Sequence, residues 1–224
     1  MERKGVFAKM DIEPFDNFIN SLRESLHKGL PGETVQRTMA PAARLKLMEH
    51  TIPDETTRMS AVLIPIFPHE GRAHIVFIKR QTYDGIHSAQ VAFPGGKKEE
   101  SDDNMLETAL REAEEEVGIR PESVTILGTL TPLFIPISNY LVLPVIGILK
   151  ERPTFYPNLQ EVEYIIEMPI CQLLQPNSRS VITQNLGGLP LSTPHFKAGE
   201  DMIWGATAMI LAEFIELIQP SSCY

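Results

Sequence analysis

Cysteines and long apolar runs are scarce in this chain. Two of its 224 residues are cysteines, Cys171 and Cys223, and they form neither a disulfide framework nor a zinc-binding pattern. No apolar stretch approaches the roughly 20 residues that a membrane-spanning helix requires, and residues 1–11 do not resemble a secretory signal peptide. We therefore expect a cytoplasmic protein that has no membrane partner.

Basic residues are fewer than acidic residues in this chain. The chain has 20 lysines and arginines against 29 aspartates and glutamates, which gives a formal net charge of −9. This balance argues against a nucleic-acid-binding surface, and the sequence shows no appended basic helix-turn-helix. If the substrate is an anion, local cations and metal ions must offset the negative field of the whole molecule. We expect no nucleic-acid partner.

What remains is an ordinary globular composition, with 43 % hydrophobic and 22 % charged residues. Strand-like and helical patterns are interspersed without an internal repeat, which predicts an α/β architecture with a mixed sheet between helices. We expect a helical extension over residues 1–50 and the main domain over residues 51–224. The amphipathic stripe of residues 11–30 must be buried on that domain or on a second subunit, so a homodimer is one alternative.

Individual elements follow from the same patterns. Strand-like runs are expected at 60–67, 74–80, 90–93, 124–130, 141–149 and 163–168, with a late hairpin over 180–191. Helices are expected at 42–49 and 206–217. Trp204, just before the last helix, is predicted to lie in the core.

The most informative segment covers residues 93–119, with the sequence FPGGKKEESDDNMLETALREAEEEVGI. On a helix with about 100° per residue, Glu112, Glu115 and Glu116 fall within an arc of about 100°, next to an apolar arc. Three crowded carboxylates repel one another at neutral pH, and a hard divalent cation relieves that repulsion. The alternative is a solvated acidic helix, which is the usual meaning of a charge run.

Two features favour a metal site over a solvated helix. Lysines four residues after the glutamates, which would form surface ion pairs, are absent, whereas Arg111 can brace Glu115 from one turn away. Gly95 and Gly96 lack a Cβ atom, so their backbone can approach a ligand closely. Gly118 is predicted to end the helix in a left-handed conformation.

This segment resembles the Nudix box, whose pattern is Gly-x5-Glu-x7-Arg-Glu-apolar-x-Glu-Glu-x-Gly-apolar. The matching residues are Gly96, Arg111, Glu112, Ala113, Glu115, Glu116, Gly118 and Ile119. The early acidic position is held by Asp102, and eight residues instead of seven separate it from Arg111. Because the extra residue precedes the helix or lies at its start, we expect Asp102 and Asp103 to act as N-terminal caps.

The resemblance implies a Nudix-like α/β/α sandwich that hydrolyses a diphosphate linkage in a small-molecule substrate, with Mg²⁺ or Mn²⁺ as cofactor. It implies Glu112 and Glu116 as first metal ligands, Glu115 as a third carboxylate and the Gly96 carbonyl as a backbone ligand. Arg111 would orient these carboxylates.

A base is also needed to activate the attacking water. It could be one of the box glutamates or a residue of a later loop, for which Glu161 and Glu163 are the candidates.

The region before the box resembles the coenzyme A-hydrolysing branch of the same family. Shared positions are Arg80, His87, Gln90, Val91, Ala92, Phe93, Pro94, Gly95, Gly96 and Lys97. This branch implies cleavage of coenzyme A or acyl-CoA into 3′,5′-ADP and (acyl-)phosphopantetheine, with Arg80, His87 and Lys97 contacting anionic groups. Gly85 and Ala89 depart from it, because the branch has arginine and glycine at these positions.

Other interpretations stay open. His87 could instead form a structural hydrogen bond in a loop, and the side chain of Lys97 could be solvated. A Nudix hydrolase of ADP-ribose or of a dinucleoside polyphosphate would share every catalytic residue. A non-catalytic nucleotide-binding regulator is a further alternative, although the intact glutamates disfavour it.

Overall fold

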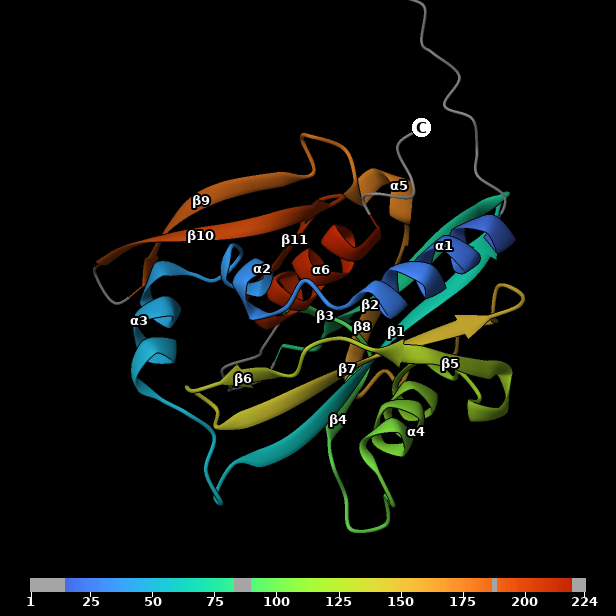
Figure 1. Cartoon of the computed structure of the whole chain (residues 1–224), viewed down its shortest axis with the longest axis horizontal. Coiled ribbons are helices and arrows are strands. Elements are labelled where there is room, and N and C mark those ends of the chain that lie inside the picture. Colours follow the sequence, from blue (N-terminus) through green and yellow to red (C-terminus); the bar gives the residue numbers. More distant parts are fainter. Residues whose placement is uncertain (1–14, 83–89, 187–188, 219–224) are drawn as a thin grey trace, which may run out of the picture.

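The computed structural model describes residues 15–82, 90–186 and 189–218, and their arrangement is shown in Figure 1. The helices are α1 (Phe15–Lys28), α2 (Glu33–Arg37), α3 (Ala42–His50), α4 (Met105–Val117), the 3-10 turn η1 (Pro121–Ser123), α5 (Ile170–Leu173) and α6 (Gly205–Ile218). The strands are β1 (Arg58–His69), β2 (Arg72–Arg80), β3 (Val91–Ala92), β4 (Gly95–Lys97), β5 (Val124–Thr129), β6 (Leu133–Ile135), β7 (Tyr140–Leu149), β8 (Val162–Pro169), β9 (Arg179–Leu186), β10 (Leu189–Ala198) and β11 (Asp201–Trp204).

The described strands β1 to β8 form one mixed sheet. Strands β3, β2, β1, β7 and β5 follow one another, while β8, β4 and β6 pair with β2, β1 and β7. The central strands β1 and β7 run parallel, with Val62 opposite Pro144, and the other pairs are antiparallel. Both central strands are apolar over most of their length, as expected for strands that are covered on both faces.

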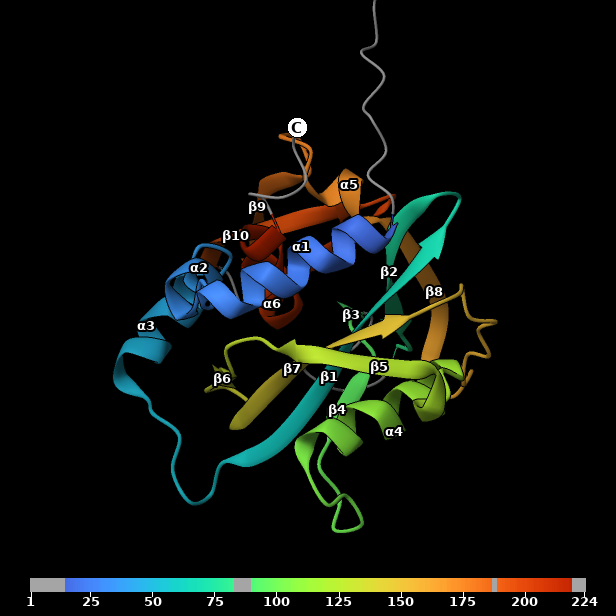
Figure 2. The same ribbon diagram turned by 45° about the vertical axis from the view of Figure 1, so that its right-hand side comes forward.

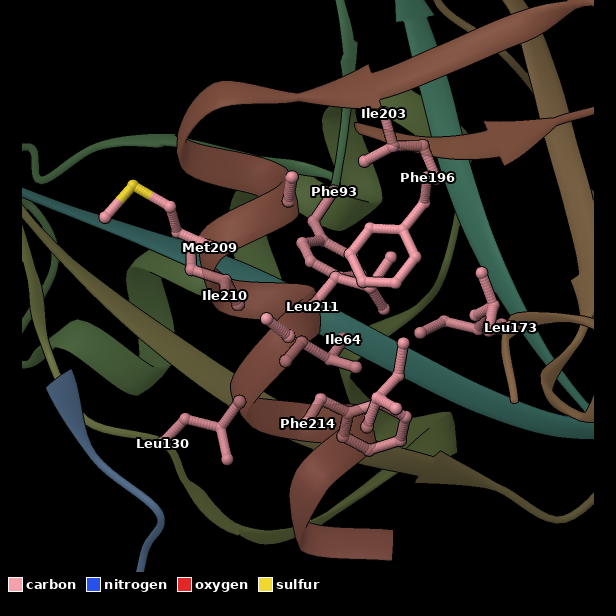
Figure 3. Packing of buried hydrophobic residues seen from close by; sticks show 14 of the residues in the cluster. Ile64, Phe93, Leu130, Leu173, Phe196, Ile203, Met209, Ile210, Leu211 and Phe214 are labelled. Carbon is pink, nitrogen blue, oxygen red and sulfur yellow. The ribbon is translucent and has the colours of Figure 1, made fainter. Parts of the chain in front are cut away.

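The two faces of β1 contribute to different cores, because successive side chains of a strand point to opposite sides. Leu63 and Phe67 lie in a core that β1 shares with α4. Ile64 and Ile66 lie in a second core, shared with α6. Figure 3 shows Ile64 within this second cluster, together with Phe214 of α6. The sheet therefore lies between α4 on one side and α6 on the other.

The N-terminal helices pack on the α6 side. Helix α1, predicted within residues 11–30, is confirmed, and its stripe of Phe18, Ile19 and Leu22 is buried in the core that contains α6. Figure 2 shows α1 lying across this side of the molecule, with α2 next to it and close to α6. Helix α1 thus buries its apolar face on the same chain.

A second, antiparallel sheet of β11, β10 and β9 also borders α6. The late hairpin predicted over 180–191 is much longer here, because β10 continues to Ala198 and β11 adds a strand. The expectation for Trp204 was wrong, since its side chain is only half-buried and its neighbour Ile203 occupies the core.

The layers confirm the predicted α/β/α sandwich with a mixed sheet (Figures 1 and 2). Among the described residues, no helix combines the length and the apolar character needed to cross a bilayer.

Candidate active site

The glycine pair fixes one wall of the site. Strand β4 pairs with β1, with Ala61 opposite Gly96 and Val62 opposite Gly95. A Cβ atom on Gly95 would collide with the backbone of β1, and one on Gly96 would collide with the carboxyl group of Glu112. Glycine at position 95 is therefore needed for β4 to pair with β1, and glycine at position 96 leaves room for the Glu112 carboxyl group.

Helix α4 is held at both ends. Asn104 is its N-cap, and its side-chain oxygen accepts hydrogen bonds from the backbone N–H groups of Leu106 and Glu107. The expectation that Asp102 and Asp103 would cap the helix was therefore wrong. Gly118 ends the helix with a φ of 74°, as predicted for a left-handed residue.

Arg111 gathers the acidic groups at one side of the helix. Its Nε and Nη2 atoms each donate to Asp102 at 2.9 Å, which makes a bidentate pair with a buried carboxylate. Its Nη1 atom donates to Glu112 at 3.1 Å and to Glu115 at 3.3 Å, and Nη2 also donates to the Lys97 carbonyl at 3.1 Å. The hydrogen bonds from Arg111 hold the pKa of Asp102 well below its usual range and raise the pKa of Arg111.

Glu116 lies at the centre of the site and is 1 % exposed. Its Oε2 atom accepts a 2.8 Å hydrogen bond from the Gly95 N–H group. Its Oε1 atom has no hydrogen bond, although Nη1 of Arg80 lies 3.6 Å away. The same arginine donates through Nη2 to the Gly95 carbonyl at 2.9 Å, so Arg80 ties β2 to the glycine turn and to α4.

Burial changes the protonation of the two inner glutamates. It raises the pKa of Glu116 to about 7, against the opposing effects of Arg80 and the Gly95 N–H group. Burial also raises the pKa of Glu112, which Arg111 partly offsets. The negative charge of Glu161 raises both of these pKa values further, which places Glu161 within electrostatic reach of the pair.

The three glutamates of the predicted cluster differ in exposure. Glu116 is buried, Glu112 is largely buried, and the side chain of Glu115 is 57 % exposed. In the part of the chain that the structure describes, no three His, Cys, Asp or Glu side chains gather closely enough to hold a cation alone. Mg²⁺ needs no such cage, because it commonly uses one or two carboxylates together with waters and substrate phosphates.

The residues present fit a hard divalent ion. The Oε1 atom of Glu116 is buried and accepts no hydrogen bond, and the nearby Arg80 guanidinium stays 3.6 Å away, so the lone pairs of this atom remain available to a metal ion. The Glu112 carboxyl group lies directly against Gly96. Oxygen atoms of carboxylate and carbonyl groups are the ligands that such ions prefer.

The remaining predicted residues occupy different places. Lys97 is exposed, and the hydrogen bond that involves it uses its carbonyl group. Glu161 and Glu163 are both exposed on the segment that leads into β8 and at its start. His87 lies outside the described residues.

One interaction of the site was missed at the sequence level. Asp102 was recognised as the early acidic residue of the box, but its role as the main partner of Arg111 was not. Thr108 also donates to Asp102 through its hydroxyl group at 2.9 Å. Because Asp102 precedes the helix and Arg111 lies nine residues later, no helical spacing relates them.

Known proteins are similar to this chain in sequence and in fold. A family model of the NUDIX domain matches residues 57–162. A protein described as uncharacterized Nudix hydrolase NudL from Pectobacterium atrosepticum is 41 % identical over 127 residues, which are 57 % of this chain and 65 % of that relative. This chain therefore aligns with just under two thirds of that relative. A protein with the same description from Photorhabdus laumondii is 33 % identical over 165 residues, covering 74 % of this chain and 87 % of that relative.

A solved structure supports the fold alone. The crystal structure of a MutT/nudix family protein from Enterococcus faecalis matches with a TM-score of 0.53 and 13 % identity, over 84 % of this chain and 73 % of that one. The sandwich and the glycine turn that faces buried carboxylates define the class of protein, an α/β/α sandwich with an acidic helix at its candidate site. The chain belongs to the Nudix hydrolase family, whose members act on pyrophosphate linkages.

Proposed function

We propose that the chain hydrolyses the diphosphate linkage of coenzyme A or an acyl derivative, giving 3′,5′-ADP and (acyl-)phosphopantetheine. The observation that carries the hydrolytic part is the buried Glu116 carboxylate, whose Oε1 atom lacks a hydrogen bond at the glycine turn. The choice of substrate depends on the sequence from Arg80 to Lys97, which resembles the coenzyme A branch.

Glu112 and Glu116 would hold Mg²⁺ or Mn²⁺, with the Gly96 carbonyl as a further oxygen ligand. When bound, such an ion would polarise the phosphoryl oxygens and offset their charge. Arg111 fixes Glu112 from one side, and Arg80 and the Gly95 N–H group fix Glu116 from the other. This bracing keeps the two carboxylates in place before substrate arrives, so little reorganisation is needed during the reaction.

Glu161 is the better candidate for the base that orients or deprotonates the attacking water. After burial, its negative charge is a smaller contribution to the raised pKa of both Glu112 and Glu116, which supports a position near the pair. Glu163 acts instead on Tyr164, whose pKa it helps to raise on the same strand. The backbone also anchors Glu161, because its carbonyl accepts from Gln81 N–H and its N–H donates to the Asn158 carbonyl.

A substrate panel tests the proposal. Coenzyme A, ADP-ribose and a dinucleoside polyphosphate are incubated with Mg²⁺ or Mn²⁺, and the products are identified by mass. We expect 3′,5′-ADP and phosphopantetheine from coenzyme A, with the highest kcat/KM of the three. A higher kcat/KM for ADP-ribose would overturn the assignment of coenzyme A as substrate but not the assignment as a hydrolase. If none of the compounds is hydrolysed, the result would favour a nucleotide-binding regulator.

Paired variants test the roles of the carboxylates. Glu116→Gln keeps the size of the side chain and removes its charge, and we expect turnover to fall on the order of 100-fold or more while the protein stays folded. Glu161→Gln should lower kcat clearly more than Glu163→Gln, which serves as the matched control. Equal effects of the last two variants would reject Glu161 as the base.

A further inference from the structure

Asp201 of β11 bridges two strands of the main sheet, although β11 itself belongs to the second sheet. Its Oδ1 atom accepts a 2.7 Å hydrogen bond from Nζ of Lys79 on β2, and its Oδ2 atom accepts one of 2.7 Å from the hydroxyl group of Tyr164 on β8. Lys79 and Tyr164 stand opposite each other in the ladder of β2 and β8. The side chains of Lys79 and Asp201 are only 19 % and 17 % exposed, so solvent screens this ion pair less than a surface pair.

The protonation of the three groups suits these two hydrogen bonds. The hydrogen bond to Asp201 is the main reason that the pKa of Tyr164 rises to about 12. Burial acts to raise the pKa of Asp201, but the hydrogen bonds from Lys79 and Tyr164 outweigh it and lower this pKa overall. At neutral pH one carboxylate therefore holds a cross-strand pair from outside the sheet.

The ladder of β2 and β8 changes its register directly after this pair. Lys79 lies opposite Tyr164, but the next residue of β2, Arg80, lies opposite Val162. Glu163 is therefore the extra residue of a β-bulge. Bulges are frequent next to active sites, where they change the direction of a side chain or end the pairing of two strands.

Two groups of the candidate site lie just beyond the bulge. Arg80 points to the opposite face of the sheet from Lys79 and lies 3.6 Å from Glu116. The backbone N–H group of Gln81 donates to the Glu161 carbonyl at 2.9 Å. Without the bulge, this part of β8 would shift by one residue along β2, which is about 3.3 Å. A displacement of this size at a catalytic group is costly.

We propose that Asp201 is a positioning residue for the candidate active site. By holding the cross-strand pair together, Asp201 fixes the register at the β-bulge and therefore the places of Arg80 and Glu161. The inference rests on the proposed function, because Glu161 is the proposed base. Asp201 acts through β2 and β8 and not by contact with the reacting atoms. The second sheet thereby gains a role in catalysis.

Asp201→Asn tests this role, because the amide keeps the size of the side chain but cannot accept both hydrogen bonds as a carboxylate does. We expect kcat for coenzyme A, or for whichever compound of the panel is hydrolysed, to fall about tenfold or more, measured well below the melting temperature. Glu167→Gln is the matched control and should leave kcat unchanged, since Glu167 pairs with Arg152 on the same strand away from the bulge. A lower melting temperature with an unchanged kcat in Asp201→Asn would overturn the proposal.

Tyr164→Phe covers the case in which Asp201→Asn fails to fold. It removes one hydroxyl group and leaves the ion pair of Lys79 and Asp201 in place. We expect kcat to fall about threefold to tenfold, as for the loss of one hydrogen bond. A kcat equal to that of Glu167→Gln would overturn the proposal.

Amide hydrogen exchange followed by NMR tests the placement without catalysis. The N–H group of Gln81 is protected in the wild type by its hydrogen bond to the Glu161 carbonyl. We expect it to exchange about tenfold faster or more in Asp201→Asn, whereas Phe77 in the middle of β2 keeps its rate. An unchanged rate at Gln81, or an equal increase at both residues, would overturn the proposal. If no compound of the panel is hydrolysed, the proposed function fails and this measurement alone decides on the role of Asp201.

Discussion

Two arginines with different partners shape the site at the scale of single residues. Arg80 reaches from β2 to Glu116 and the Gly95 carbonyl, whereas Arg111 connects Asp102 with Glu112 on its own helix. The first contributes a cation to a buried carboxylate, and the second holds several acceptors in one geometry. Lysine could supply the charge of either arginine but not the planar fork.

Arg111→Lys tests whether that fork is needed. The variant loses the bidentate pair with Asp102 and the hydrogen bonds to Glu112 and Glu115, so we expect kcat to fall about tenfold or more and the metal affinity to weaken. Arg120→Lys is the control, since Arg120 and Glu122 are both strongly exposed and 3.7 Å apart, a pairing that is worth little. If Arg111→Lys and Arg120→Lys have the same kcat and the same metal affinity, the bracing role of Arg111 is rejected.

Glu116 gives the metal-free protein a pH-dependent stability. The pKa of Glu116 in the folded protein is about 7, above the value of about 4.3 for an unfolded glutamate. The contribution of Glu116 to the free energy of unfolding is therefore fully present below about pH 4 and is lost as the pH rises through 7. We expect the free energy of unfolding to fall over this window in EDTA, and Glu116→Gln to remove most of that fall. Denaturant titrations at a series of pH values measure it, with Glu115→Gln as the exposed control. An unchanged pH slope in Glu116→Gln would contradict the effect of burial.

At the scale of elements, the acidic helix and the strand-like runs that became β1, β2, β3, β5, β7 and β8 were predicted from the sequence, whereas several short strands were not. The apolar period of α4 and the position of Gly118 were visible in the sequence, because a helix with an apolar face is a local pattern. Strands β6 and β11 were not predicted, since each is short and is defined by its pairing with β7 or β10. The pair of Asp102 and Arg111 was missed for the same reason, because only the folded loop brings the two together.

Gly96→Ala tests how β4 and α4 fit together. A methyl group at this position would collide with the carboxyl group of Glu112, so this carboxylate must move away from the glycine turn. We expect kcat/KM to fall on the order of 100-fold, because small displacements of catalytic groups are costly. Gly199→Ala is the control: its φ of 65° strains an alanine, but nothing lies near the added atom. It should lower stability alone, and equal losses of activity would count against the collision.

For the whole molecule, a buried carboxylate joins segments that are distant in sequence. Glu213 of α6 accepts from the N–H group of Gly32, from Nε2 of Gln36 and from the N–H and hydroxyl groups of Thr131. It is 0 % exposed, so these donors take the place of water as hydrogen-bond partners of its carboxyl group. The network joins α2 and the residue before it, the loop before β6, and α6, which no sequence pattern indicated.

Glu213→Ala should therefore be strongly destabilising. It leaves several buried donors without an acceptor, and we expect a loss of about 3 to 5 kcal/mol in the free energy of unfolding. Glu216→Ala, which changes an exposed glutamate of the same helix, should cost less than about 0.5 kcal/mol. Denaturant unfolding of both variants provides the comparison, and similar midpoints for the two would show that the network contributes little.

The parallel pairing of β1 with β7 has a consequence for synthesis on the ribosome. The centre of the sheet cannot form until β7 has been synthesised, because Val62 of β1 pairs with Pro144 of β7. The second core also requires α6, which lies near the end of the described chain. Until then, the nascent β1 exposes an apolar strand whose edge can pair with other chains. A slowed ribosome between these two strands would lengthen that exposure, so translation speed over residues 70–140 should influence how much of the protein is recovered in active form.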